Sequence, residues 1–322
     1  MTTKICGVLL LFFVLLTQTT HAWNDTGHMT VAELAWRNLS ASKRTAISNL
    51  LKQHPHYSLL LATNVPAGVD TNEWVFLKAA TWPDMVRPNF GAPHPKPPEI
   101  IKYHHDKWHY INLPYVWPAD AGHAFNTNYS ATNILWALSN AVSVLKDANE
   151  STTNQAVSLC WVLHLIGDVH QPLHATMIFA TNYPHGDAGG NALAVAEPGL
   201  QPTNLHAFWD DLLGTGTSYH FIDTLADGLE AGSPYDATKT KEYKKNTTYP
   251  SWAHESCAAA QAFAYLDGEL KFADWNDYST NKFSATAVPV LAGSYVSNAE
   301  NLAHRRIALA GQRLAKVLKK LF

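Results

Sequence analysis

The stretch HLIGDVHQPLH, residues 164–174, most constrains the fold, because it places charged side chains inside an apolar helical pattern. The pattern from residue 154 to residue 169 is that of a helix, on which His164 and Asp168 share one face. A carboxylate among such apolar neighbours needs a strong partner. By itself the pair fits either metal ligands or unrelated polar residues on an apolar helix.

The same helix is expected to continue to His174, which would then lie roughly 80° around the axis from His164. Pro172 is expected to bend the helix just before this residue, because proline lacks the amide hydrogen that the helix needs.

The rest of the chain also reads as mainly helical. Helical patterns cover residues 29–39, 43–52, 72–86 and 132–146, and helices resume near Leu205, Trp252 and Val288, the last running to Phe322. Residues 108–113 read as a short extended segment, and the apolar run 192–196 reads as a strand. No repeat or linker interrupts these patterns. They predict an all-α, mainly helical single domain with a short β-hairpin.

The first 22 residues read as a secretory signal peptide. Lys4 precedes an unbroken apolar run at 8–16, and Thr20-His21-Ala22 has the small-x-small form of a cleavage site. The apolar run is too short to span a bilayer, and no later stretch approaches 18 apolar residues. We therefore expect a leader at 1–22, a catalytic domain at 23–322, and a secreted or periplasmic protein that does not insert into a membrane.

Composition limits the kinds of site that this chain can build. The net charge is −3, and loss of the leader with its one lysine makes it −4, which disfavours a surface that grips nucleic acid by charge alone. A bound divalent ion could reverse the local field in a cleft. With 17 histidines and 3 cysteines, a metal site here would use nitrogen and oxygen ligands. Cys160 and Cys257 form one disulfide or remain buried thiols.

Two further motifs repeat the chemistry of the first. LHAFWD places His206 and Asp210 four residues apart near an expected helix start, the same spacing as in the first pair. TWPDMVR places Asp84 and Arg87 three apart, again on one helical face. A repeated His-x-x-x-Asp pair in a histidine-rich exported chain favours metal binding over chance.

A third motif, KWHYINLP, puts His109 in the extended segment between two aromatic residues. In a strand, Trp108 and Tyr110 would point away from the face that carries His109.

These motifs together resemble the trinuclear-zinc nucleases, the fungal single-strand-specific nucleases and the plant bifunctional nucleases. The resemblance rests on Trp23 with His28, WPDMVR, WHYI, HLIGDVHQPLH, Gly-Gly-Asn at 189–191 and LHAFWD, in that order. The WAHES stretch within 251–256 and the closing helix extend it over nearly the whole mature chain. It implies a fold like that of zinc phospholipase C and the single-strand nucleases.

The resemblance implies three Zn²⁺ ions. The first would be held by Asp84, His109 and His164, with Asp168 bridging from it to a second ion. His28 and the main-chain amine and carbonyl of Trp23 would complete the second site. The third, more exposed ion would be held by His174, His206 and Asp210. Imidazole and carboxylate ligands suit zinc, and they also suit cobalt or manganese.

The place of Trp23 directly after the cleavage site gives that residue a chemical role. An α-amine titrates near pH 8, so a neighbouring dication displaces its proton readily. The amine nitrogen and carbonyl oxygen of one residue then form a five-membered chelate ring. The alternative is a frayed terminus before a surface His28.

The activity implied by the resemblance is cleavage of RNA and single-stranded DNA to 5′-phosphate products, together with 3′-nucleotidase activity. A hydroxide that bridges two zinc ions would attack phosphorus, and the third ion would bind phosphate and the leaving oxygen. Asp84, Arg87 and Asp168 would be the catalytic residues, with the guanidinium of Arg87 steadying the phosphorane charge. The substrates are single-stranded DNA, RNA and 3′-nucleotides, and a monomer is expected.

Three residues are expected to bind substrate: Tyr110, Asn112 and Asn191. Tyr110 would stack a free base, which a duplex does not offer. Asn112 stands where the fungal enzymes have an aspartate that contacts the base, so base preference is expected to be broader or different. Most histidines outside the motifs are expected in loops or on the surface, and His185 and Asp187 are candidates to support the site.

Two other functions remain open at this point. A zinc-dependent phospholipase C shares the trinuclear architecture, but that group has glutamate at the position of Asp210. A secreted, non-catalytic zinc-binding protein would use closed sites with four protein ligands, whereas the outer site here has three. Both observations favour the nuclease.

Overall fold

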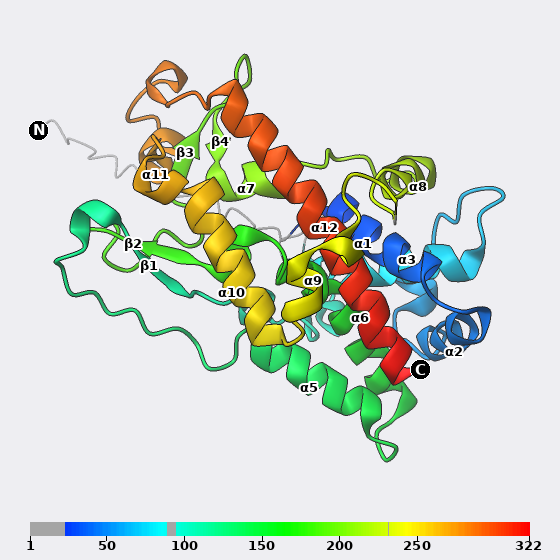
Figure 1. Ribbon diagram of the computed structural model, residues 1–322. Helices are drawn as coiled ribbons and strands as arrows, with labels where there is room; N and C mark the ends of the chain where they lie inside the picture. Colours follow the sequence, from blue (N-terminus) through cyan, green and yellow to red (C-terminus); the bar gives the residue numbers. More distant parts are fainter. Residues whose placement is uncertain (1–22, 89–94, 231) are drawn as a thin grey trace, which may run out of the picture.

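Helix α6, at Thr152–Asp168, lies at the centre of a helical molecule (Figure 1). The computed structural model describes residues 23–88, 95–230 and 232–322. Helix α6 packs against α1, α3, α5 and α12, and its residues from Leu159 to Asp168 are buried. Ser151 caps its start by accepting a hydrogen bond from the amide of Asn154. The apolar helix of the first motif is therefore surrounded by other helices.

The longest helix, α12 at Gly293–Leu321, crosses the molecule and packs along α1 at Asp25–Arg37 (Figure 1). The close approach of these two helices depends on Gly311, where a Cβ atom would lie 2.5 Å from Leu34. The remaining α-helices are α2 Ala41–Leu51, α3 Thr71–Met85, α4 Pro98–Ile101, α5 Ile134–Lys146, α7 Leu205–Asp210, α8 Tyr219–Asp227, α9 Lys241–Lys245, α10 Tyr249–Ala259 and α11 Trp275–Ser279.

Strands are short and form two separate sheets. Strand β1 at Pro114–Val116 pairs in parallel with β2 at Met177–Phe179. The second sheet has the order β4-β3-β5, with β3 at Leu193–Val195 antiparallel to both β4 at Thr203–Asn204 and β5 at Ala273–Asp274. The mainly helical fold predicted from the sequence is confirmed, and the β3–β4 pair is its short hairpin.

The helix α6 ends at Asp168 and does not reach His174, contrary to the sequence prediction. The amides of His170 and Gln171 bond three residues back, to Gly167 and Asp168, and Gln171 is extended. A proline disfavours the helical conformation of the residue that precedes it, so the chain leaves the helix before Pro172. His174 then lies in a separate 3-10 turn, η4 at Pro172–Ala175.

Two further boundaries differ from the predictions. The expected extended segment at 108–113 begins as a 3-10 turn, η2 at Asp106–His109, and the strand comes later, at β1. The closing helix begins at Gly293 rather than near Val288, because Pro289 and Leu291 exchange backbone hydrogen bonds with Ala196 beside β3.

Other expectations concern the membrane, the cysteines and the leader. Across residues 23–88, 95–230 and 232–322, no helix combines the length and apolar character needed to cross a membrane. Cys160 and Cys257 are both buried free thiols. The predicted leader at 1–22 lies outside the described residues.

Candidate metal centre

Six structural elements bring the predicted ligands together in the interior. Helix α1 carries His28 in its first turn, α3 carries Asp84 near its end, and the last turns of α6 carry His164 and Asp168. His109 closes the η2 turn, His174 lies in η4, and α7 carries His206 and Asp210. All eight side chains are buried. They form three groups in which one atom of each member could bind the same metal ion.

The first group contains Asp84, His109 and His164, with Asp168 beside them. His164 Nε2 lies 3.0 Å from His109 Nδ1 and 3.1 Å from Asp168 Oδ2. Asp84 Oδ1 is 3.8 Å from each of the two imidazole nitrogens. Ligands about 2.0–2.1 Å from a tetrahedral zinc ion lie about 3.3 Å from one another, so these separations fit one ion.

The second group joins His28 to the other carboxylate oxygen of Asp168. His28 Nε2 lies 3.2 Å from Asp168 Oδ1, and the His28 ring stacks on His164 at 3.8 Å. This approach requires Gly167, where a Cβ atom would lie 2.9 Å from His28 Nδ1. Asp168 thus faces both groups, one oxygen to each, as expected of a bridging ligand.

Trp23 is fully buried directly before this group. It packs against the first turn of α1, where a Cβ atom at Gly27 would lie 2.6 Å from Trp23 Cβ. Trp23 and His28 are therefore interior residues and not surface residues. The role of Trp23 as a main-chain ligand stays a prediction.

The third group contains His174, His206 and Asp210. His174 Nδ1 donates to the carbonyl of His109, and His206 Nδ1 donates to the carbonyl of Gly189. In neutral rings these bonds leave lone pairs on both Nε2 atoms, which nonetheless lie 3.0 Å apart. Two lone pairs do not attract each other, so this arrangement suits a shared cation.

The carboxylates of Asp84, Asp168 and Asp210 lie in different electrostatic environments. Burial alone raises the pKa of Asp84, but Arg87 and the imidazoles of His164 and His109 bring it below its ordinary value. Asp168 behaves alike, because His164 and the bonded imidazoles outweigh burial. Asp210 differs: burial, with Asp211 and other carboxylates adding to it, raises its pKa well above the ordinary value, although the hydrogen bond from Gln171 opposes this.

Buried polar atoms without hydrogen-bond partners test whether a metal fits. In the part of the chain that the structure describes, His28 Nε2, Asp168 Oδ1 and Asp210 Oδ2 are buried and make no hydrogen bond. Buried polar groups normally have a hydrogen-bond partner, because a buried polar atom without one carries a desolvation penalty. All three face other ligand atoms in the groups above. The donor set therefore fits bound dications, which would also offset the negative surroundings of Asp210.

The predicted substrate-binding residues line one cavity beside the groups. Its volume is about 280 Å³. Tyr110, Asn112 and Asn191 line it together with Arg87 and the ligands His109, His174 and His206. Arg87 is nearly buried, and its Nε lies 3.0 Å from Asp84 Oδ1, so the guanidinium stands between the first group and the cavity. Asp84 and Asp210 also line a second cavity of about 350 Å³.

Asp187 holds in place the loop that contains Gly189 and lines the cavity beside Tyr110. Its carboxylate is buried and accepts hydrogen bonds from the amides of Ile178, Gly189 and Gly190 and from the hydroxyl of Tyr265. Burial raises its pKa to about 6 despite these donors. The loop so held presents the carbonyl of Gly189 to His206. His185 lines the cavity itself.

Some contributors were not singled out from the sequence. Gln171 Nε2 donates to Asp210 Oδ1 at 2.7 Å, and Gly167 makes room for His28. Asp106 and Met177 also line the cavity. The only signals were a glutamine inside the first motif and a glycine in an otherwise apolar helix.

His54, His56 and His170 lie in loops or turns, as expected for most of the remaining histidines, but all three are buried. His56 Nδ1 accepts a hydrogen bond from the indole of Trp82, and His170 bridges the carbonyl of Ile166 and the guanidinium of Arg313. Their neutral rings act as interior hydrogen-bond partners.

The similarity of this chain to known proteins extends over all the residues described above. The family model described as S1/P1 Nuclease matches residues 23–322. Nuclease S1 of Aspergillus oryzae is 25% identical over 326 residues, which cover 93% of this chain and 92% of the relative. Endonuclease 4 and Endonuclease 3 of Arabidopsis thaliana are each 24% identical, with 93% of this chain and 89% of each relative covered.

Proposed function

This chain belongs to the S1/P1 nuclease family, and on that premise we propose that it is a zinc-dependent nuclease acting on single strands. It hydrolyses RNA and single-stranded DNA to 5′-phosphate products and releases phosphate from 3′-nucleotides. The observation that carries the proposal is the cavity in which metal-ligand histidines, Arg87 and Tyr110 meet. Such a reaction needs ligands for the metal ions, a cationic side chain that binds the phosphate, and an aromatic ring on which a base can stack.

The three groups would hold three Zn²⁺ ions with the ligands predicted from the sequence. Bound zinc would supply Lewis acidity toward the phosphate oxygens and lower the pKa of a coordinated water toward neutrality. Asp168 fixes the spacing between the first two groups, because each of its oxygens faces one of them.

Arg87 acts on the scissile phosphate from the cavity wall. Its planar fork can bind two phosphate oxygens while Nε stays on Asp84. The pairing also fixes the guanidinium before substrate arrives, so little reorganisation is needed as charge develops on phosphorus.

Tyr110 gives the preference for single strands. Its ring is half-buried in the wall of the cavity, where an unpaired base can stack on it. A base in a duplex would first have to leave its stack. Asn112, in the same wall, can donate to and accept from a base edge, which favours a broad base preference.

Export creates the last ligand. The family match begins at Trp23, the first residue after the predicted cleavage site. Cleavage there would free an amine next to the second group, where Trp23 packs on the first turn of α1. The protein is thus proposed to be secreted or periplasmic, to gain its full metal content on maturation, and to act as a monomer.

The test compares the mature chain that starts at Trp23 with a twin carrying one extra residue before it. Metal content is counted on both, and both are assayed on single-stranded DNA, duplex DNA, 3′-AMP and phosphatidylcholine. We expect three zinc ions and single-strand cleavage for the first, with loss of metal and activity in the twin.

Each contrary result removes a different part of the proposal. Full activity of the twin would show that Trp23 is not a ligand. Equal cleavage of duplex and single strands would remove the role given to Tyr110. Hydrolysis of the lipid without hydrolysis of nucleic acid would replace the nuclease by a phospholipase C.

A further inference from the structure

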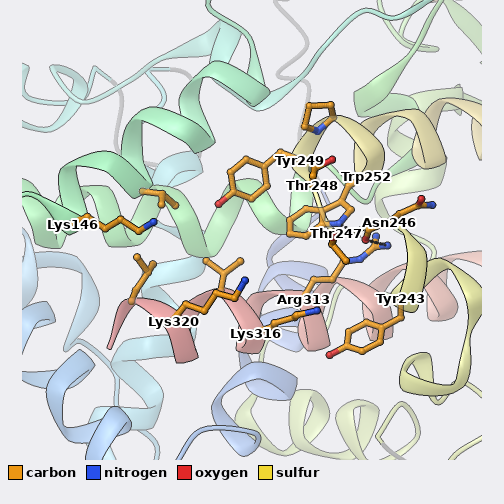
Figure 2. A pocket seen from close by; sticks show the side chains of 14 residues that line it. Lys146, Tyr243, Asn246, Thr247, Thr248, Tyr249, Trp252, Arg313, Lys316 and Lys320 are labelled. Atoms are coloured by element: carbon orange, nitrogen blue, oxygen red, sulfur yellow. Dashed lines mark hydrogen bonds between the residues drawn. The ribbon is translucent and has the colours of Figure 1, made fainter.

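Another hollow, distinct from the two cavities at the metal centre, lies between the ends of two helices (Figure 2). Its volume is about 520 Å³. The end of α5, the last turns of α12 and the segment 243–252 before and within α10 form its walls. None of the predicted metal or substrate residues lines it.

Three lysines line this hollow, and none of the acidic residues that the structure describes does. Lys146 comes from α5, and Lys316 and Lys320 come from α12. Within the described residues none of the three takes part in an ion pair, in a protein whose net charge is −3. Figure 2 shows the ammonium groups of Lys146 and Lys320 turned toward the space between them.

Helix dipoles alone do not account for this cluster. Lysine in the last turn of a helix is favourable, which suits Lys146 and Lys320 taken singly. Lys316 and Lys320 are however four residues apart on one helix, where like charges repel. Two helices also place their cations against the same space. Such a concentration of positive charge is stabilised by an anion.

Three aromatic side chains also line the hollow, those of Tyr243, Tyr249 and Trp252. Lys316 covers the ring of Tyr243, 5.5 Å from its centre, and Arg313 covers the ring of Trp252 at 5.1 Å. The half-buried ring of Tyr249 packs edge-on against Trp252, and no cation of the described residues lies over it in this way. Tyr249 is therefore the ring that can receive a flat ligand.

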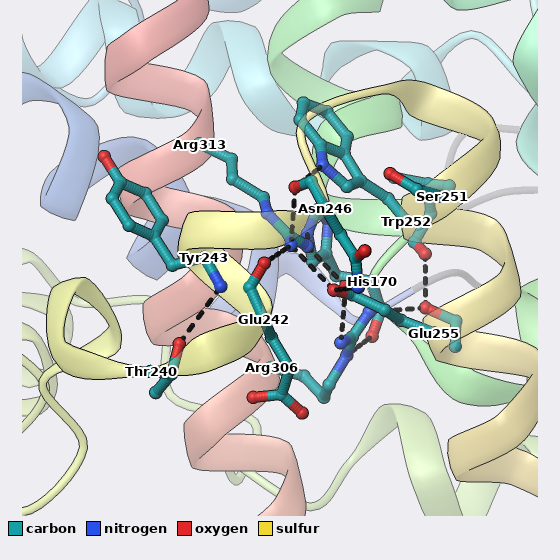
Figure 3. A network of polar contacts seen from close by, with 12 residues as sticks. His170, Thr240, Glu242, Tyr243, Asn246, Ser251, Trp252, Glu255, Arg306 and Arg313 are labelled. Atoms are coloured by element: carbon teal, nitrogen blue, oxygen red, sulfur yellow. Dashed lines mark hydrogen bonds and ion pairs between the residues drawn. The ribbon is translucent and has the colours of Figure 1, made fainter.

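Hydrogen bonds and ion pairs hold the floor of the hollow in place. Arg313 donates to both carboxylate oxygens of Glu255 and to the carbonyls of Glu242 and Asn246 (Figure 3). Glu255 also pairs with Arg306. Glu255 is thus shared by two guanidiniums whose hydrogen bonds point into the protein, whereas the three lysines make no ion pair among the described residues.

We propose that this hollow is a binding site for a nucleotide unit, with its phosphate on the lysines and its base on Tyr249. The inference rests on the proposed nuclease function, because a single strand that enters the metal centre carries further nucleotides. Positive charge along the backbone and an aromatic ring for a base are the general means of binding single strands. The site is an anchoring site and takes no part in hydrolysis.

The floor also links the hollow to the metal centre. Arg313 Nη1 donates to Nε2 of His170, and Arg306 donates to the carbonyl of His170 (Figure 3). His170 lies in the turn between Asp168 and His174. One layer of side chains therefore separates the anchored nucleotide from the turn that carries ligands of all three groups.

The first test uses hydrogen exchange on the mature, metal-loaded protein with 5′-dAMP, a product of the proposed reaction that is not consumed. We expect slower exchange in residues 243–252 and 313–321. The protection should persist in Lys319→Ala and disappear in the double variant K316A/K320A. Lys319 is the matched control, because it is exposed on the same helix and does not line the hollow.

The second test measures the salt dependence of KM for a long single-stranded oligonucleotide. Loss of the contact with one phosphate lowers the slope of log KM against log salt by roughly 0.7 for single strands. We expect this difference between K316A/K320A and K319A, and equal slopes would overturn the proposal.

The outcomes separate this proposal from the nuclease function. Protection by 5′-dAMP at the metal centre alone would overturn the second site and leave the function standing. Protection in the hollow by inorganic phosphate equal to that by 5′-dAMP would overturn the role of Tyr249. Protection by anionic phosphatidylserine vesicles in place of the nucleotide would make the hollow a membrane contact. A wild type that cleaves neither strands nor 3′-AMP would instead refute the function.

Discussion

Replacement of Gly167 by alanine tests the bridging position of Asp168 without removing any ligand. A Cβ atom there would lie 2.9 Å from His28 Nδ1, whereas ordinary contacts begin near 3.4 Å. His28 must therefore move by about 0.5 Å, and metal–ligand bonds tolerate only about 0.2 Å. We expect the Gly167→Ala protein to hold one ion fewer than the wild type, or to hold it at least about tenfold more weakly, as when a partner of a zinc ligand is disturbed.

The fold itself should tolerate this change. Alanine is favoured over glycine by about 1 kcal/mol inside a helix, which offsets the crowding once His28 is free to swing away without metal. The metal-free protein should then unfold within about 1 kcal/mol of the wild type in urea. Gly293→Ala, at the start of α12 with no atom within 4 Å of the added carbon, is the control. Metal counts and a chelator competition provide the assay. An unchanged count with unchanged affinity would refute the reasoning about His28.

Three further results are expected. Burial lowers the pKa of His54 to about 3, so the stability tied to its neutral ring is present above about pH 6.5 and is lost as the pH falls toward 3. In urea melts, the unfolding free energy of the wild type should fall between pH 7 and pH 5. His54→Asn should make this fall smaller by about 2 kcal/mol. His254→Asn, at an exposed position, is the control and should leave the fall unchanged. Arg87→Ala should lower kcat on single-stranded DNA by about 10²–10³, with Arg87→Lys between it and the wild type, and an unchanged kcat would exclude a role in the transition state. Chelation should lower the melting temperature reversibly, since each ion at 1,000 times its Kd stabilises by about 4 kcal/mol, and calorimetry that shows no shift would contradict the three metal groups.

The local parts of the metal centre were predictable because helix geometry sets them. Four-residue spacing places His164 beside Asp168 and His206 beside Asp210, and both pairs lie on helices as expected. The parts that depend on irregular backbone were not predictable. His174 was expected on the same helix as His164, but the chain leaves that helix before Pro172. That turn aims the imidazole of His174 at the group on α7.

The histidines outside the motifs show a second limit. Nothing in the sequence separates the interior His170, two residues from Asp168, from an exposed histidine such as His254. Its burial is decided by Arg306 and Arg313, more than 130 residues further along the chain. A neutral imidazole can be a ligand or an interior hydrogen-bond partner, and only the groups around it decide between them.

The sequence by itself determined a mainly helical fold, and it predicted a leader before Trp23 and a set of nitrogen and oxygen ligands in place of cysteine. These follow from periodicity, apolar runs and residue chemistry, all of which act over a few neighbouring residues. Tertiary structure decided which candidate ligands lie close enough to share an ion, that Arg87 is held on Asp84, and that three lysines from two helices line one hollow. Those features depend on how helices distant in sequence pack, and close packing fixes them through contacts that leave no local pattern in the chain.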